Sequence, residues 1–155
     1  MRAPALFMLK VSCSNLERSR AFYGELGFEP DGEPATAEAP WLASLYGIAG
    51  ARIRAQQLRA ADSAAPVRLE LLEWAAPASA ARPSIDTPGC AGLSFRTDDL
   101  DATARRLVAA GGRIVGTIPE FHGGRSTTRL VNVADPDGLT LQLVEVRRLN
   151  SSGPQ

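Results

Sequence analysis

The strongest constraint on the fold of this chain is an internal repeat. Segments 67–74 (VRLELLEW) and 139–146 (LTLQLVEV) align position for position, and each is a short run typical of a strand. The matched positions are Leu69-Glu70-Leu71 with Leu141-Gln142-Leu143 and Glu73 with Glu145. The chain is therefore expected to contain two related halves that end on equivalent strands.

Both halves also begin alike, with a strand-type run followed by a helix. The first reads LFMLKVSCS and then NLERSRAFYGELGF, with Asn15 as the N-cap, and the second reads CAGLSFRT and then DDLDATARRLVAAGG, with Asp98 or Asp99 as the N-cap. Helical spacing predicts apolar faces of Leu16, Ala21, Phe22 and Leu26 in the first helix and of Leu100, Ala104, Leu107 and Val108 in the second.

Further strand-type runs lie between each helix and the last strand, so each half predicts the order β-α-β-β-β. We expect an α+β fold made of two tandem modules, 6–74 and 89–147. Residues 75–88, rich in Ala, Pro and Ser, are expected to form a linker, and residues 148–155 a disordered tail.

The charge balance indicates which partners to expect. Seventeen basic residues balance 17 acidic residues, and the chain carries no basic surface signature, so neither nucleic acid nor a membrane surface is an expected partner. No signal peptide or membrane-length apolar run is visible, and Cys13 and Cys90 form no disulfide or zinc pattern. We therefore expect a cytoplasmic protein with a small organic molecule as its partner.

These segments together resemble one known family. The helix signature ERSRAFYGELGF, the strand RLELLEW, the second helix segment and the turn in DPDGLTLQLVE resemble the vicinal oxygen chelate superfamily, which contains glyoxalases, bleomycin-resistance proteins and extradiol dioxygenases. The resemblance implies strands that curve into an open, cup-shaped mixed sheet, and it implies a homodimer. In many members the cup holds a divalent metal that polarises the oxygens of the substrate.

Most of the metal-ligand positions that the resemblance implies hold poor ligands in this chain. By counting from the helix segments they fall on Met8 and Gly92, and on the last strands they fall on Glu70 and Gln142. A thioether is a poor ligand for hard divalent metals and glycine has no side chain, so we expect no metal ligands and no cofactor. A metal-dependent lyase, epimerase or dioxygenase remains an alternative.

Strand alternation predicts the residues that line the cup. We expect Glu70 and the sole histidine, His122, to be catalytic, Glu70 as an acid or base and His122 from a loop. The expected substrate-binding residues are Met8, Lys10, Trp41, Tyr46, Arg54, Leu72, Ser94, Arg96 and Gln142. In the competing structural interpretation, Glu70 is only neutralised by Arg52, Arg54 or Arg96, and Trp41 and Tyr46 only pack instead of forming a flap.

Two functions from different classes follow. The first is a metal-independent enzyme that isomerises, cyclises or cleaves a small aromatic or polyketide-like carbonyl compound by acid/base chemistry. The second is a protein that resembles the bleomycin-resistance branch and sequesters a small molecule without chemistry. The emptied ligand positions favour the first, because the cup would persist while Glu70 took over the chemistry.

Overall fold

The computed structural model describes residues 6–61, 67–77 and 84–148. The chain divides into two compact units, Met1–Ala81 and Arg82–Gln155, which we call the first and the second module and describe separately. The predicted tail lies outside the described residues except for Arg148, and so does much of the predicted linker. No helix within the described ranges is long and apolar enough to cross a membrane.

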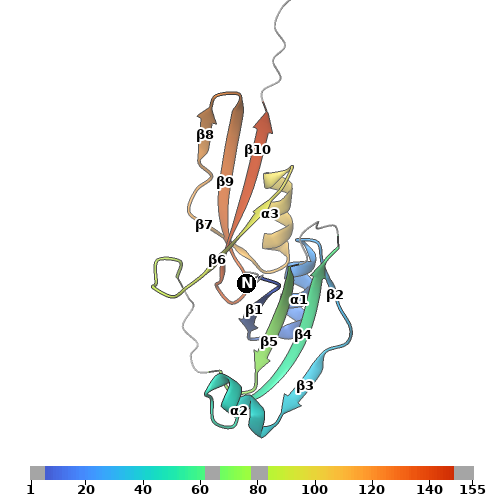
Figure 1. Cartoon of the computed structure of the whole chain (residues 1–155). Coiled ribbons are helices and arrows are strands. Elements are labelled where there is room, and N and C mark those ends of the chain that lie inside the picture. The colour runs from blue at the N-terminus through green and yellow to red at the C-terminus, as the bar shows by residue number, and fades with distance from the viewer. Residues whose placement is uncertain (1–5, 62–66, 78–83, 149–155) are drawn as a thin grey trace, which may run out of the picture. The chain divides into compact units, whose positions relative to one another are not determined.

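The first module is a five-stranded mixed sheet with two helices (Figure 1). Its sheet has the order β1-β5-β4-β2, in which β1 and β5 are parallel, and β3 also pairs with β4. The elements are β1 (Met8–Cys13), α1 (Leu16–Gly24), β2 (Phe28–Pro30), β3 (Ala35–Glu38), α2 (Pro40–Tyr46), β4 (Arg52–Ala60) and β5 (Arg68–Trp74).

The second module repeats this arrangement with the sheet order β6-β10-β9-β7. Here β6 and β10 are parallel, and β8 also pairs with β9. The elements are β6 (Gly92–Arg96), α3 (Leu100–Ala109), β7 (Arg113–Val115), β8 (Glu120–Gly123), β9 (Ser126–Ala134) and β10 (Thr140–Arg148). The predicted α+β class with two tandem modules is therefore confirmed.

Each sheet contains one strand more than the predicted order, because the second strand of each module is split. β2 and β3 both pair with β4, separated by residues 31–34, and β7 and β8 both pair with β9, separated by residues 116–119. Gly32 and Gly116, with φ of 84° and 76°, allow the chain to leave and rejoin the neighbouring strand. The split is thus repeated with the rest of the fold.

The helix caps are as predicted, but the buried faces differ in part. Asn15 accepts a hydrogen bond from the Arg18 amide, and Asp99 accepts one from the Ala102 amide. The buried residues are Leu16, Ser19, Phe22 and Tyr23 in α1 and Leu100, Thr103, Ala104 and Leu107 in α3. The predictions of Ala21 and Val108 as core residues are wrong, since both are exposed, and Leu26 is only half-buried beyond the end of α1.

Tertiary packing explains the difference in α1. The Tyr23 ring makes edge contacts with Phe22, at 5.3 Å between centroids, and with Phe28 of β2, at 6.5 Å. Burying this large ring stabilises the helix more than burying the single methyl group of Ala21. As a result, α1 turns the side that carries Tyr23, and not the side that carries Ala21, toward the core.

The modules differ most at the connection that precedes their long strands. In the second module a tight turn joins β8 to β9, whereas in the first module residues 39–51, which include α2, join β3 to β4. Leu42 of α2 is fully buried in a cluster with Ala51, Ile53 and Leu72. Arg54 is ion-paired to Glu17 of α1, and side chains alternate along a strand, so α2 covers the sheet face opposite α1.

Candidate functional site

The centre of the candidate site is an ion pair on the face of the first sheet that α2 covers. Lys10 and Glu70 lie opposite each other in the parallel register of β1 and β5, and the Lys10 Nζ donates a hydrogen bond to Glu70 Oε2. The Glu70 side chain is only 15% exposed, whereas that of Lys10 is 49% exposed. The carboxylate is therefore held in place while the ammonium remains accessible.

The ion pair fixes the charge of Lys10. The hydrogen bond to Glu70 raises the pKa of Lys10 above its usual value, partial burial opposes the change, and the negative charge of Glu70 raises the pKa further. Lys10 is therefore protonated at neutral pH and can act as a hydrogen-bond donor but not as a base.

Two aromatic side chains lie beside this pair. Tyr46, the last residue of α2, contacts Trp74 of β5 edge-on, with 5.1 Å between ring centroids. The indole Nε1 of Trp74 donates a 3.1 Å hydrogen bond to the Ser12 hydroxyl on β1. These contacts place an aromatic wall next to the charged pair, as the sites of small organic ligands often have.

Four of the predicted residues thus share one face of the first sheet: Met8, Lys10, Glu70 and Leu72, with Tyr46 brought to them by α2. Leu72 is almost fully buried beneath α2, so its surface contacts protein. Trp41 also lies on α2 and is 57% exposed.

The partner of Glu70 differs from the three arginines considered in the sequence analysis. Lys10 makes the ion pair, while Arg52 pairs with Glu38 at 3.5 Å and Arg54 with Glu17 at 2.6 Å. The parallel register of β1 and β5 decides this outcome, because it places Lys10 directly beside Glu70.

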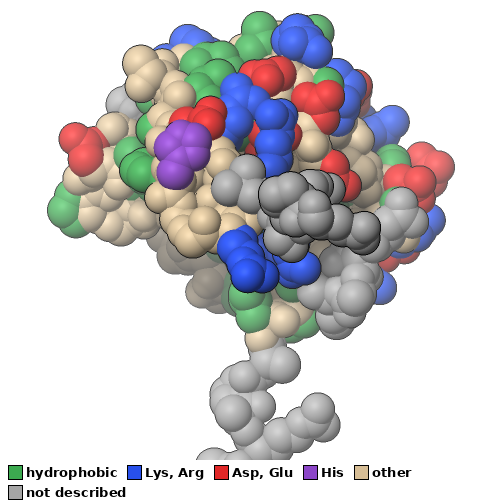
Figure 2. Space-filling model, turned by 90° about the horizontal axis from the view of Figure 1, so that it is seen from above, with side chains coloured by type: hydrophobic (Ala, Val, Ile, Leu, Met, Phe, Trp, Pro, Cys, Tyr) green, Lys and Arg blue, Asp and Glu red, His purple; other side chains and the backbone are tan. Residues whose placement is uncertain are grey.

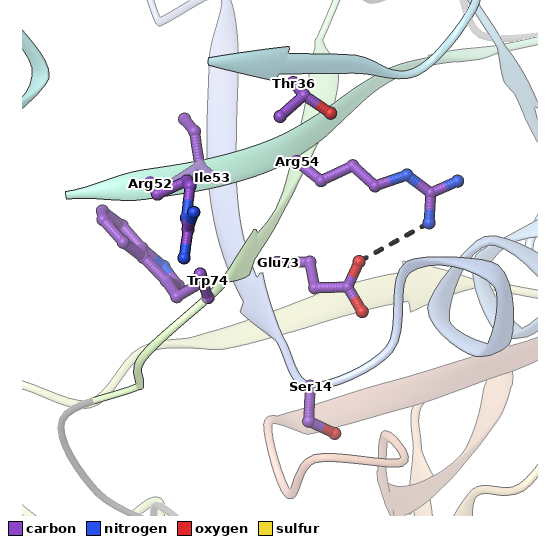
Figure 3. A pocket seen from close by; sticks show the side chains of 8 residues that line it. Ser14, Thr36, Arg52, Ile53, Arg54, Glu73 and Trp74 are labelled. Carbon is purple, nitrogen blue, oxygen red and sulfur yellow. Dashed lines mark ion pairs between the residues drawn. The ribbon is translucent and has the colours of Figure 1, made fainter. Parts of the chain in front are cut away.

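Arg54 lies on the opposite face of the first sheet, the face that α1 covers. There it lines a separate pocket of about 380 Å³ (Figure 3) at the end of the sheet. The structure therefore does not bring Arg54 together with Lys10 and Glu70.

In the second module, Ser94, Arg96 and Gln142 share the sheet face opposite α3. Ser94 lies opposite Gln142 in the parallel register of β6 and β10. The Gln142 Nε2 donates a 3.3 Å hydrogen bond to Asn132 Oδ1 on β9. These residues form a polar strip on this face.

His122 lies on β8 and not in a loop. It is opposite Thr127 in the register with β9, and its Nδ1 lies 3.3 Å from the Thr127 hydroxyl. Alternation places His122 on the face of Arg129, away from Gln142. Its side chain is 73% exposed, and Figure 2 shows the single histidine at the surface among acidic and basic side chains.

The residues at the family's metal positions do not fit a divalent metal. The Glu70 carboxylate is bound by the Lys10 ammonium, and Met8 offers only a thioether. A side-chain carbon added at Gly92 would lie 3.1 Å from the Ile85 Cδ1, and the Gln142 amide is engaged with Asn132. Among the described residues no three His, Cys, Asp or Glu side chains are grouped to hold a metal ion.

The sequence analysis did not predict Gln57 as a site residue. Gln57 lies opposite Glu70 in the antiparallel register of β4 and β5 and so borders the ion pair. Its position depends on the register between β4 and β5, and no local motif in the sequence specifies that register.

The chain consists of two tandem βαβββ-type modules, and in each module the first and last strands are parallel neighbours. This arrangement places it among α+β proteins with duplicated modules. The family model of the Glyoxalase/Bleomycin resistance protein/Dioxygenase superfamily matches residues 5–143. The chain belongs to this superfamily, as its helix and turn motifs indicate. A search of curated proteins found no significant match.

Solved structures show the same fold. A glyoxalase family protein from Bacillus cereus is 20% identical, with a TM-score of 0.79 over 94% of this chain and 96% of that chain. One from Enterococcus faecalis is 21% identical, with a TM-score of 0.55 over 91% and 97%. A glyoxalase I variant from Zea mays is 19% identical, with a TM-score of 0.61 over 90% of this chain and 44% of its own. At these identities the likeness shows the fold alone.

Proposed function

We propose that this protein is a metal-independent enzyme that moves a proton on a small carbonyl compound with a planar part. The observation that supports this most directly is the Lys10–Glu70 pair, a carboxylate and an ammonium held side by side next to the Tyr46–Trp74 wall. We further propose that the protein is cytoplasmic and, as the resemblance to this superfamily implies, a homodimer.

In the proposed reaction, the Lys10 ammonium donates a hydrogen bond to the carbonyl oxygen of the substrate. The Glu70 carboxylate removes a proton from the neighbouring carbon, and the electron pair of that C–H bond forms the enolate. Lys10 stabilises the negative charge that develops on the oxygen. Protonated Glu70 then returns the proton to another carbon, which completes an isomerisation without an oxidant or a further reactant.

The test uses Glu70→Gln, which keeps the shape of the side chain but removes the base. The purified protein is first screened by thermal shift against planar carbonyl compounds, and each stabilising compound is incubated with the protein and analysed by mass spectrometry or NMR. We expect Glu70→Gln to abolish turnover while binding and folding persist. Lys10→Met is a second variant, which should weaken both binding and turnover. Turnover retained by Glu70→Gln would remove Glu70 from the mechanism.

A second candidate is binding without chemistry. The ion pair is satisfied without a ligand, and the Tyr46–Trp74 wall by itself suits a planar molecule. Unchanged ligand after long incubation would support sequestration, and a new product would support catalysis. Elemental analysis of protein purified without metal-affinity resin tests the metal-dependent alternative, which stoichiometric metal with activity lost on chelation would establish.

A further inference from the structure

The two modules repeat one ionic contact between helix and sheet. In each, an acidic residue at the second position of the helix and an acidic residue on the last strand hold an arginine of the long strand. The contacts are Arg54 with Glu17 at 2.6 Å and Glu73 at 3.6 Å, and Arg129 with Asp101 at 2.8 Å and Glu145 at 3.4 Å. We call each set of three residues a triad.

In the second module, two further charged side chains contact the residues of the triad. Glu120 lies opposite Arg129 in the register of β8 and β9, with 3.9 Å between Oε2 and Nε. Arg147 donates a 3.1 Å hydrogen bond to the second carboxylate oxygen of Glu145. As a result the Glu145 side chain is only 1% exposed and that of Arg129 only 18%.

The first triad lacks both of these charges. Thr36 lies opposite Arg54, where Glu120 lies opposite Arg129, and Ala75 follows β5 where Arg147 extends β10. The Arg54 side chain is accordingly 40% exposed. The space next to it is the pocket of about 380 Å³, in which Figure 3 shows Arg54 and Glu73 on one side and Arg52 and Trp74 on the other.

We propose that this pocket binds the carboxylate of a small planar ligand, and that this carboxylate takes the place which the Glu120 carboxylate has in the second module. Arg52, at the position of Thr127, adds a second guanidinium. Guanidinium groups bind carboxylates through paired hydrogen bonds, and the Trp74 ring offers a flat apolar surface for the rest of the ligand.

This binding is weak and specific for an anion. Glu73 also lines the pocket and opposes a negative charge, while Arg54 remains paired with Glu17 and Arg52 with Glu38. We therefore expect a Kd of about 1 mM for a simple ligand. The polar lining lies on the α1 side of the sheet, whereas Lys10 and Glu70 lie on the α2 side. Trp74, the last residue of β5, borders both, so the two sites share this residue, and the pocket goes beyond the proposed function.

The first experiment titrates the ¹⁵N-labelled full chain with sodium benzoate and follows the two indole N–H signals by NMR. We expect a saturable shift of the Trp74 signal, while the Trp41 signal on α2 serves as an internal reference. Benzamide, which has the same shape without the charge, is the matched control ligand and should leave both signals in place. No saturable shift of the Trp74 signal up to about 20 mM benzoate would overturn the proposal.

The second experiment introduces at position 36 the glutamate that the second module has at the equivalent position 120. Thr36→Glu places a carboxylate opposite Arg54 and should weaken benzoate binding at least about tenfold by repulsion. Thr36→Gln adds nearly the same volume without charge and should weaken binding far less, and circular dichroism confirms that both variants fold. Equal losses in the two variants would contradict the anion site.

A third variant separates this proposal from the proposed function. Glu70→Gln should leave the benzoate-induced shift of Trp74 unchanged, because Glu70 does not line the pocket. A shift that is lost in Glu70→Gln but kept in Thr36→Glu would place benzoate at the Lys10–Glu70 pair and overturn the pocket assignment.

Discussion

The first and second modules share strand order and register but differ at one connection and along one edge strand. Residues 39–51 add α2 to the first module, where the second has a tight turn. On the edge, Thr36 stands where the second module has Glu120. The two modules therefore share their core and their triads. The candidate sites lie where the first module differs from the second, at α2 and along the edge strand.

The largest expected effect tests whether the two cores are equivalent. Leu71 of β5 and Leu143 of β10 occupy matching positions and are fully buried. Leu71→Ala and Leu143→Ala should each lower the free energy of unfolding by about 2–5 kcal/mol, since each leaves a cavity. Urea denaturation measures both, and a loss below about 1 kcal/mol in either would break the equivalence of the two cores.

A smaller effect is expected from the element that only the first module has. Leu42→Ala removes the buried anchor of α2 and should cost about 1–3 kcal/mol, because α2 can detach while the sheet stays intact. Hydrogen exchange should increase in residues 40–46 but not in β4 or β5. Exchange that increases across the whole first module would show that α2 is part of its core.

The triads should differ in their contribution to stability. Arg129→Met leaves the buried Glu145 carboxylate with Arg147 as its remaining partner among the described residues, whereas Arg54→Met leaves Glu73 partly exposed to water. We expect the larger drop in Tm for Arg129→Met, measured by calorimetry with the two variants side by side. Equal drops in Tm would mean that the contacts of Glu120 and Arg147 with the second triad add no stability.

The smallest effect is a change in acid stability. Arg129 lowers the pKa of Asp101 below its usual value of 3.8, so this carboxylate stabilises the fold above that pH and loses the contribution as the pH falls through its lowered pKa. Asp101→Asn should therefore be less stable than the parent at neutral pH, with a difference that shrinks as the pH falls below about 4. Thermal unfolding between pH 7 and pH 3 checks this, and a constant difference would contradict the linkage.

Local patterns in the sequence determined much of the fold. Asn15 and Asp99 carry the side-chain oxygens that helix N-caps require, and the repeat of residues 67–74 in 139–146 predicts two equivalent final strands. Alternation along β1 and β5 was enough to place Met8, Lys10, Glu70 and Leu72 on one face. These features depend on neighbours in sequence, which is why they can be read without a structure.

Only the tertiary structure decided which of these residues meet. The parallel register gives Glu70 the partner Lys10 and not an arginine, helix-to-sheet packing holds Arg54 on the α1 side, and strand pairing carries His122 to the face of Arg129. Each outcome depends on contacts between segments far apart in the chain, and a shift by one residue would reverse the face of every side chain in a strand. The sequence therefore determined the faces of the strands, and long-range pairing determined the partners across them.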